Sequence, residues 1–288
     1  MSVDILQDKI RKTKNPSLVE LALPLSDLPE GFTPDAAGYG RFCRELLEGL
    51  RGIVPGVRVS FAAFALLGSE GICELSSVLK FAGENGFYVL LDAPEIWSAA
   101  AAELTAQVLF AGQSIYPCDG IVISGYMGSD VIKPFLSGCK ESGKDLFVVA
   151  RTANKSAPEI QDLLAGSRLV HIAAADHVNR YCGETVGKFG YSRVGILGAA
   201  SAADSLRNLR SKYPKLFILL DGFDYPNSNA KNCSYAFDKF GHGAAACAGR
   251  SILCAGKDTD NPEENWLEAS VAAAERVKKN MTRYVNIL

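Results

Sequence analysis

The chain has 288 residues, 48% of them hydrophobic and 22% charged, which is enough for one large α/β domain with a substantial core. The 30 Lys and Arg against 32 Asp and Glu give a formal net charge of -2, which argues against nucleic acid or an acidic membrane as a partner. The first 14 residues lack the apolar core of a signal peptide, and no apolar run approaches the ~20 residues that a membrane span requires. We therefore expect a cytoplasmic protein, a single domain over residues 1–288, with a small molecule as its partner.

Short apolar runs alternate with amphipathic segments along the chain. The apolar runs predict eight strands, over residues 18–23, 57–64, 87–92, 120–124, 146–150, 194–197, 216–220 and 244–248. Apolar residues at helical spacing predict helices over residues 34–50, 71–85, 98–112, 130–142, 157–165, 170–182, 202–213 and 262–285. Most of the strands are apolar throughout rather than alternating, as in a parallel sheet covered on both faces. This pattern favours a TIM (β/α)8 barrel, with an open doubly wound sheet as the alternative.

The stretch over residues 235–257 carries the clearest local signal for a ligand. It predicts a short helix ending at Gly241, then the small-residue strand 244–248, then Gly249-Arg250 at the strand's carboxyl end. The loops after the last barrel strands commonly hold a phosphate, and an arginine there suits a bidentate grip on it. An arginine in a surface salt bridge is the alternative interpretation. The polar segment 224–232 is either a flap over this site or an ordinary surface loop.

Other motifs of catalysis or ligand binding are missing from the sequence. It contains neither a Walker A lysine motif nor a G-x-G-x-x-G turn. The 8 cysteines include no C-x-x-C pair, which predicts buried free thiols, and the 3 histidines have no metal-ligand spacing. We therefore expect no metal site. Trp97 and Trp266 either stack on a base or, as is commoner near helix starts, pack in the fold.

From about residue 4 to residue 279, the chain resembles the bacterial orotidine 5'-phosphate decarboxylases in their longer, second-type form. The matching runs are Lys14-Asn15-Pro16, residues 125–130 with Lys133-Pro134-Phe135, Arg151-Thr152-Ala153-Asn154, residues 194–214 and residues 237–253. The resemblance implies a barrel that converts orotidine monophosphate to UMP and carbon dioxide without a cofactor, usually as a cytoplasmic homodimer. It also implies that Arg250, with Gly249 and Gly222, binds the phosphate, and that Thr152 and Asn154 lie at the nucleotide.

The sequence departs from this family where the chemistry is expected. The family ends strand three with D-x-K-x-x-D; here Asp92 matches the first aspartate, but Pro94 and Trp97 replace the lysine and the second aspartate. Proline has no proton to donate to the carbanion that decarboxylation leaves. On strand two, Arg58 stands near the family's other lysine; its guanidinium keeps the positive charge but not a transferable proton, and it is placed to pair with Asp92.

Further departures lie at the ends of other strands. Strand one has Glu20-Leu21-Ala22-Leu23 in place of Gly-Leu-Asp-Pro, which removes an aspartate expected near the ribose. Ala153 replaces a serine at the pyrimidine, and Asp224, in the former phosphate flap, would repel a phosphate if it pointed inward.

Three interpretations follow from these departures. The first is a family barrel that binds OMP, UMP or a similar anion through Arg250 with weak or lost decarboxylation. The second is an active decarboxylase with a rebuilt proton donor, for example Glu95. The third is a structural or regulatory partner without a ligand. The clustering of the departures at strand ends, with the rest of the fold well patterned, favours the first interpretation.

Overall fold

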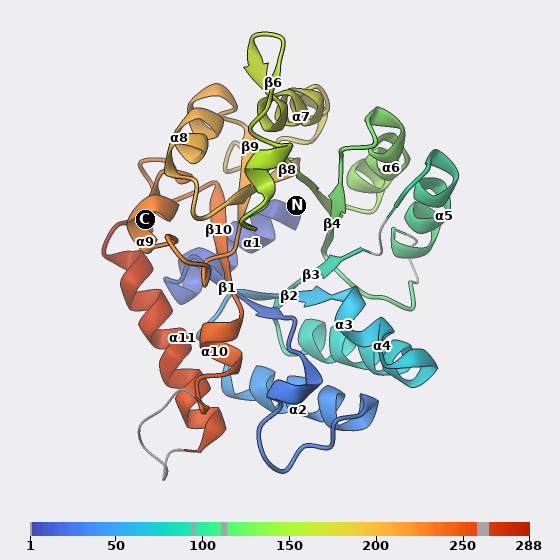
Figure 1. Ribbon diagram of the computed structural model, residues 1–288, viewed down its shortest axis with the longest axis vertical. Helices are drawn as coiled ribbons and strands as arrows, with labels where there is room; N and C mark the ends of the chain where they lie inside the picture. The colour runs from blue at the N-terminus through green and yellow to red at the C-terminus, as the bar shows by residue number, and fades with distance from the viewer. Residues whose placement is uncertain (1, 94–95, 111–113, 258–264) are drawn as a thin grey trace.

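The centre of the computed structural model is a closed barrel of parallel strands (Figure 1). The structure describes residues 2–93, 96–110, 114–257 and 265–288. Within them the barrel strands are β1 (Ser17–Leu21), β2 (Gly56–Ser60), β3 (Tyr88–Asp92), β4 (Gly120–Ser124), β5 (Asp145–Val149), β8 (Ser192–Ala199), β9 (Leu216–Asp221) and β10 (Ala244–Ala248). The strands pair in the order β1-β10-β9-β8-β5-β4-β3-β2, which confirms the TIM barrel and excludes the open sheet.

Helices surround the barrel, as the alternating pattern of the sequence predicts (Figure 1). The longer ones are α2 (Ala36–Gly49), α4 (Gly68–Glu84), α5 (Ala99–Leu109), α6 (Lys133–Glu141), α7 (Val170–Asn179), α8 (Ala203–Lys212) and α11 (Trp266–Thr282). Trp266 packs edge-on against Phe32 at 5.3 Å between ring centroids, so it belongs to the packing between helices rather than to a ligand site.

The interior of the barrel is filled by side chains of mixed size. Every residue of β10 is buried, and its small side chains make room for larger ones on the other strands. Phe147 on β5 and Phe217 on β9 meet edge to face at 5.9 Å. The barrel is therefore a packed core, and a ligand has access only at its ends.

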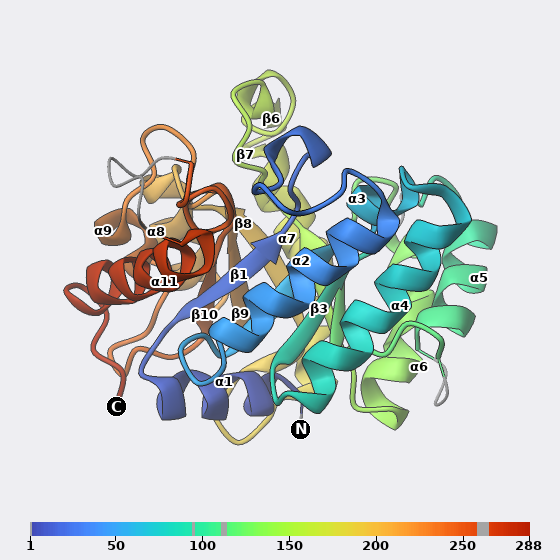
Figure 2. The same cartoon turned by 90° about the horizontal axis from the view of Figure 1, so that it is seen from below.

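The amino-terminal helix α1 (Ser2–Thr13) lies across the end of the barrel where the strands begin (Figure 2). Asp4 at its start accepts hydrogen bonds from the backbone N–H of Lys188 and Phe189, and Leu6 and Ile10 are buried. The sequence analysis did not predict this helix. Because α1 covers this end, the open face of the barrel is the opposite one, where the strands finish.

Three expected elements are wrong. Residues 157–165 do not form a helix: they hold the 3-10 turn Ala157–Glu159 and the first strand of a small hairpin, β6 (Leu164–Ala165) paired with β7 (Arg168–Leu169). The strand expected over residues 57–64 ends at Ser60, where the serine caps the short helix α3 (Phe61–Ala65). The helix expected before Gly241 lies earlier, as α9 (Ala230–Ser234), because Asn229 caps it and a turn follows.

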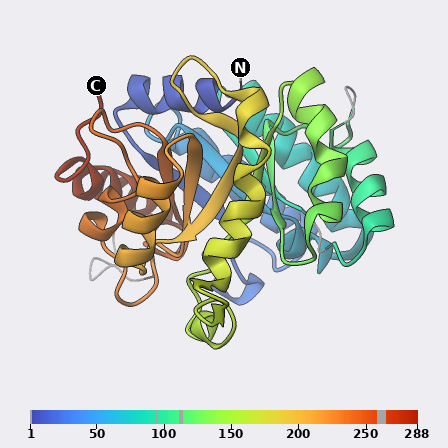
Figure 3. The same cartoon turned by 90° about the horizontal axis from the view of Figure 1, so that it is seen from above.

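The β6–β7 hairpin projects beyond the barrel at the carboxyl ends of the strands, opposite α1 (Figures 2 and 3). It lengthens the crossover between β5 and β8, for which the sequence predicted two helices rather than one. No helix in the described part of the chain is both long and apolar enough to cross a membrane.

Candidate functional site

A buried arginine surrounded by carboxylates forms the floor of the open barrel face. Arg58 on β2 donates from Nε to Asp92 Oδ1 at 2.8 Å and from Nη1 to Asp221 Oδ1 at 2.7 Å. Its Nη1 also lies 3.3 Å from Glu20 Oε1. The predicted pairing of Arg58 with Asp92 is thus confirmed, and two further carboxylates, from β1 and β9, join it. We call Glu20, Arg58, Asp92 and Asp221 the floor cluster.

Strand register explains why these residues meet. Glu20 on β1 stands directly beside Arg58 on β2, and Asp92 on β3 stands beside Ser60, two residues further along β2. Because side chains alternate between the two faces of a strand, Arg58 and Ser60 point to the same side. Asp221 ends β9 across the barrel, and the long guanidinium reaches it there. Asp92 and Asp221 end their strands and Glu20 and Arg58 lie near the ends of theirs, so the cluster forms at the carboxyl face.

The floor cluster carries more negative than positive charge. Burial raises the pKa of Glu20 to about 7, and the neighbouring carboxylates add to this rise while Arg58 opposes it. Burial likewise raises the pKa of Asp92, again against the effect of Arg58. Although burial alone lowers the pKa of Arg58, the Asp92 and Glu20 carboxylates hold it well above its usual value. At neutral pH the cluster therefore holds a permanent cation and a carboxyl group, Glu20, that is close to half protonated.

Two cavities open at this face: Arg58 lines the first, and its partners Glu20 and Asp221 line the second. One, of about 270 Å³, is lined by Arg58, Asp92, Ile96, Trp97 and Met127 among others. Trp97, with 72% of its surface exposed, lines this cavity; the resemblance to the family predicts an aspartate at its position. Pro94, at the lysine position, and Glu95 lie outside the described residues.

The second cavity, of about 340 Å³, holds the residues that the sequence assigned to a phosphate. Gly222, Gly249 and Arg250 line it, together with Glu20, Asp221, Asp224 and Tyr225. We call this the phosphate corner. Gly222 has φ +71°, and a Cβ there would lie 2.2 Å from the Cβ of Ala153, so only glycine fits. A Cβ on Gly249 would make only ordinary contacts, with Glu20, so neighbouring atoms do not demand a glycine there.

Carboxylates of the chain itself hold the donors of the phosphate corner. Asp224 Oδ2 accepts from the backbone N–H of Gly249 at 2.7 Å and of Ser251 at 3.3 Å. The half-exposed side chain of Arg250 donates to Asp27 Oδ2 at 2.7 Å. Asp224 therefore points into the phosphate corner, the orientation in which the sequence predicts that it would repel a phosphate. The polar segment expected over residues 224–232 forms a loop only as far as residue 229, because α9 begins at Ala230.

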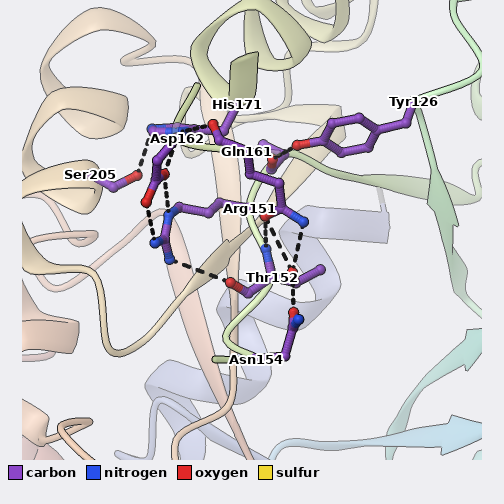
Figure 4. A network of polar contacts seen from close by, with 9 residues as sticks. Tyr126, Arg151, Thr152, Asn154, Gln161, Asp162, His171 and Ser205 are labelled. Atoms are coloured by element: carbon purple, nitrogen blue, oxygen red, sulfur yellow. Dashed lines mark hydrogen bonds and ion pairs between the residues drawn. The ribbon is translucent and has the colours of Figure 1, made fainter. Parts of the chain in front are cut away.

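The loop after β5 holds Thr152 and Asn154 in a network of its own (Figure 4). Thr152 receives a hydrogen bond from Gln161 Nε2 at 2.8 Å, and Asn154 Nδ2 donates to Ser156 Oγ at 2.8 Å. The two side chains also bond each other, so both predicted nucleotide ligands are held within the loop.

The same network fixes the base of the hairpin to the barrel (Figure 4). Arg151 grips both oxygens of Asp162, at 2.9 and 2.7 Å, which is the main reason that the pKa of Asp162 is lowered. His171 Nδ1 lies 2.9 Å from the carbonyl of Gln161, and its Nε2 lies 3.1 Å from Ser205 Oγ on α8. Burial lowers the pKa of His171, so its ring is neutral. Through its two nitrogens the ring connects Gln161, just before the hairpin, to Ser205 on α8.

The cysteines match the expectation of free thiols. All eight are free and six are buried, although Cys73 is exposed and Cys118 partly so. The described residues contain no group of three or more side chains suited to hold a metal ion.

The sequence analysis missed Asp221 and gave Glu20 no role. Both are acidic residues at or near the end of an otherwise apolar strand. That position could have indicated that both residues belong to the site, because the carboxyl ends of parallel barrel strands converge on one face.

These features define a (β/α)8 barrel with a charged site at the carboxyl face of its strands, the face that carries the active site in enzymes of this fold. No protein-family model matches the chain. Among curated proteins, it is 29% identical to an orotidine 5'-phosphate decarboxylase of Rhodopirellula baltica, covering 93% of this chain and 92% of the relative. It is 25% identical to that of Clostridium novyi, over 98% of both chains. These relatives, matched over most of their length and of this chain, support its membership of the orotidine 5'-phosphate decarboxylase family.

Solved structures support the fold. The OMP decarboxylase of Leishmania donovani superimposes with a TM-score of 0.75 at 24% identity, over 99% of both chains. The orotidine 5'-monophosphate decarboxylase of Methanocaldococcus jannaschii, solved with the inhibitor BMP, matches with a TM-score of 0.62 at 15% identity, over 93% of this chain and 99% of that one.

Proposed function

We propose that this barrel binds a phosphorylated pyrimidine nucleotide, OMP or UMP, at its carboxyl face and has weak or no decarboxylase activity. The observation that carries the proposal is the engagement of Arg58 by three carboxylates, in a chain whose sequence has proline at the lysine position. The location in the cytoplasm and the homodimer remain predictions from the resemblance to the family.

The proposed loss of catalysis rests on Arg58 and on the charge balance of the floor cluster; Glu20, with its pKa raised to about 7, is the member of the cluster that the turnover experiment below tests as a proton donor. Decarboxylation leaves a carbanion-like carbon that must receive a proton. Arg58 does not release one at any ordinary pH, since its pKa is held well above the usual arginine value. A substrate carboxylate would also meet Asp92 and Asp221 with only Arg58 to balance them, which opposes the binding of OMP more than that of UMP.

The phosphate corner supports the nucleotide half of the proposal. It combines two backbone N–H groups, those of Gly249 and Ser251, with the guanidinium of Arg250 beside a cavity of about 340 Å³. Backbone N–H groups and a forked guanidinium are the donors that phosphates take in proteins. The relative from Methanocaldococcus jannaschii was solved with the inhibitor BMP, which fits a nucleotide ligand for the family.

Turnover of orotidine monophosphate by the purified protein tests the catalytic half. We expect a rate at least ~10³-fold below that of the Rhodopirellula baltica relative assayed in parallel, because removal of a general acid typically costs about 10²–10⁴ in rate. Absorbance of the substrate measures it. Turnover comparable to the relative's, abolished by Glu20→Gln, would identify Glu20 as a rebuilt proton donor and overturn the proposal.

Calorimetry with UMP tests the phosphate corner. We expect Arg250→Ala to weaken binding by about 2 kcal/mol, roughly 30-fold, through loss of a charge-assisted contact. Arg276→Ala, which removes an exposed arginine of α11, is the matched control and should leave the dissociation constant unchanged. An identical dissociation constant in the Arg250→Ala protein would remove Arg250 from the site.

A further inference from the structure

The carboxylate of Asp224, a residue of the chain itself, already lies in the phosphate corner. Asp224 follows Gly222 and Phe223 after β9, and its Oδ2 accepts from the N–H groups of Gly249 and Ser251, at 2.7 and 3.3 Å. These amides flank Arg250 just after β10. A single carboxylate oxygen therefore occupies the position between two donors that a phosphate oxygen would need.

The guanidinium of Arg250 in the phosphate corner is also paired with a carboxylate of the chain. Arg250 donates to Asp27, which lies in the 3-10 turn Leu25–Asp27 after β1, and Lys257 approaches the other oxygen of Asp27 at 3.2 Å. The side chain of Arg250 is 59% exposed, and an ion pair this exposed to solvent contributes little to stability. Asp224 is held by two hydrogen bonds from backbone amides, at 2.7 and 3.3 Å.

We propose that Asp224 is an internal competitor for ligand phosphate, which must displace it from Gly249 and Ser251, and that it sets the selectivity of the corner. This inference rests on the proposed nucleotide function. A phosphate dianion and the Asp224 carboxylate cannot share the two amides, since both would be acceptors of like charge. Asp224 therefore lowers the affinity for phosphorylated ligands and leaves that for uncharged nucleosides unaffected.

The backbone bend of the loop that carries Asp224 is held by contacts that do not involve the Asp224 side chain. The carbonyl of Gly222 accepts from the N–H of Tyr225 at 3.1 Å and from Ser228 Oγ at 2.7 Å. Gly222 has φ +71° and a Cβ there would clash with Ala153, so the bend requires a glycine, and Tyr225 is 50% exposed. None of these contacts uses the Asp224 carboxylate, so the loop retains them when that side chain rotates out of the corner.

The test compares UMP with uridine on the full chain by calorimetry. Asp224→Asn removes the charge and keeps the shape; we expect it to bind UMP at least tenfold more tightly than the wild type, with uridine binding unchanged. Asp8→Asn makes the same change of net charge on α1, at the far end of the barrel, and should bind UMP as the wild type does. Adding Arg250→Ala to Asp224→Asn should reverse most of the gain.

The outcomes separate this inference from the proposed function. If Arg250→Ala weakens UMP binding but Asp224→Asn leaves it unchanged, the phosphate corner stands and the competition is wrong. If no variant binds UMP, the proposed function and this inference both fail. A readout without ligand checks the contact itself: amide hydrogens of Gly249 and Ser251 should exchange faster in the Asp224→Ala protein, and equal exchange would contradict the assignment.

Discussion

Arg58→Met should destabilise the protein by about 3–5 kcal/mol, the usual loss when one partner of a buried ion cluster is removed. Arg58 is 8% exposed, and its removal leaves Glu20, Asp92 and Asp221 facing one another without a cation. Urea unfolding at pH 7 measures the change in the free energy of unfolding. Arg58→Lys, which keeps the charge but not the fork, should lose less.

The matched control for this prediction is a second arginine–glutamate pair. Arg44 lies 2.6 Å from Glu74 between α2 and α4, but both side chains are about a quarter exposed. Arg44→Met should therefore lose at most about 1 kcal/mol. Combining Arg58→Met with Glu20→Gln should recover part of the loss, because one uncompensated carboxylate is gone. Equal losses at Arg58 and Arg44 would show that the floor cluster contributes no more than a surface pair.

Stability should fall as the pH rises from about 4.5 to about 7, because of Glu20. Burial raises its pKa in the folded protein to about 7 from an ordinary value of 4.5, so the folded state holds a proton that the unfolded chain has released. The favourable contribution is complete below pH 4.5 and is lost by pH 7. The shift corresponds to roughly 3 kcal/mol at 1.36 kcal/mol per pKa unit.

Glu20→Gln isolates this effect, because the amide does not titrate in that range. The wild type should lose stability relative to the Glu20→Gln protein through that range, and above pH 7 the Gln variant should be the more stable of the two. Chemical unfolding at intervals of half a pH unit between 4.5 and 8 measures the difference. Parallel curves for the two proteins would mean that Glu20 has an ordinary pKa.

The likeness to the family indicates the fold of this protein, whereas the residues at the strand ends indicate what chemistry its site supports. Strand order, the covering helices and the relatives all agree on a decarboxylase-family barrel, but barrels of one fold carry out different chemistry through the residues at their strand ends. Here those residues form a floor with one arginine and three carboxylates. That floor suits a neutral ring better than a ring that carries a carboxylate. The proposed weakness of decarboxylation follows from this charge balance and not from the fold.

Local sequence was sufficient for the barrel itself. Apolar runs of strand length, separated by helical patterns, determined strands such as Gly120–Ser124 and Ala244–Ala248 to the residue, because a strand buried on both faces leaves an uninterrupted signal. Residues 157–165, after β5, were predicted to form a helix, but they form a 3-10 turn and the first strand of a hairpin. Arg151 and His171 hold that segment through side-chain contacts spanning 11 and 10 residues, and Ser205 contacts His171 across 34 residues; periodicity reveals none of these contacts.

For the candidate site, the sequence determined which chemical groups are present, and the tertiary structure decided what each group contacts. The resemblance to the family pointed to Arg58 and Asp92, and the position after the last barrel strand pointed to Gly249 and Arg250. The strand register, together with the closure of β1 against β10, brought Glu20 and Asp221 to the same guanidinium. The loop after β9 turned Asp224 onto the amides of Gly249 and Ser251. Such pairings depend on side chains up to 163 residues apart, and only the closed barrel sets their distances.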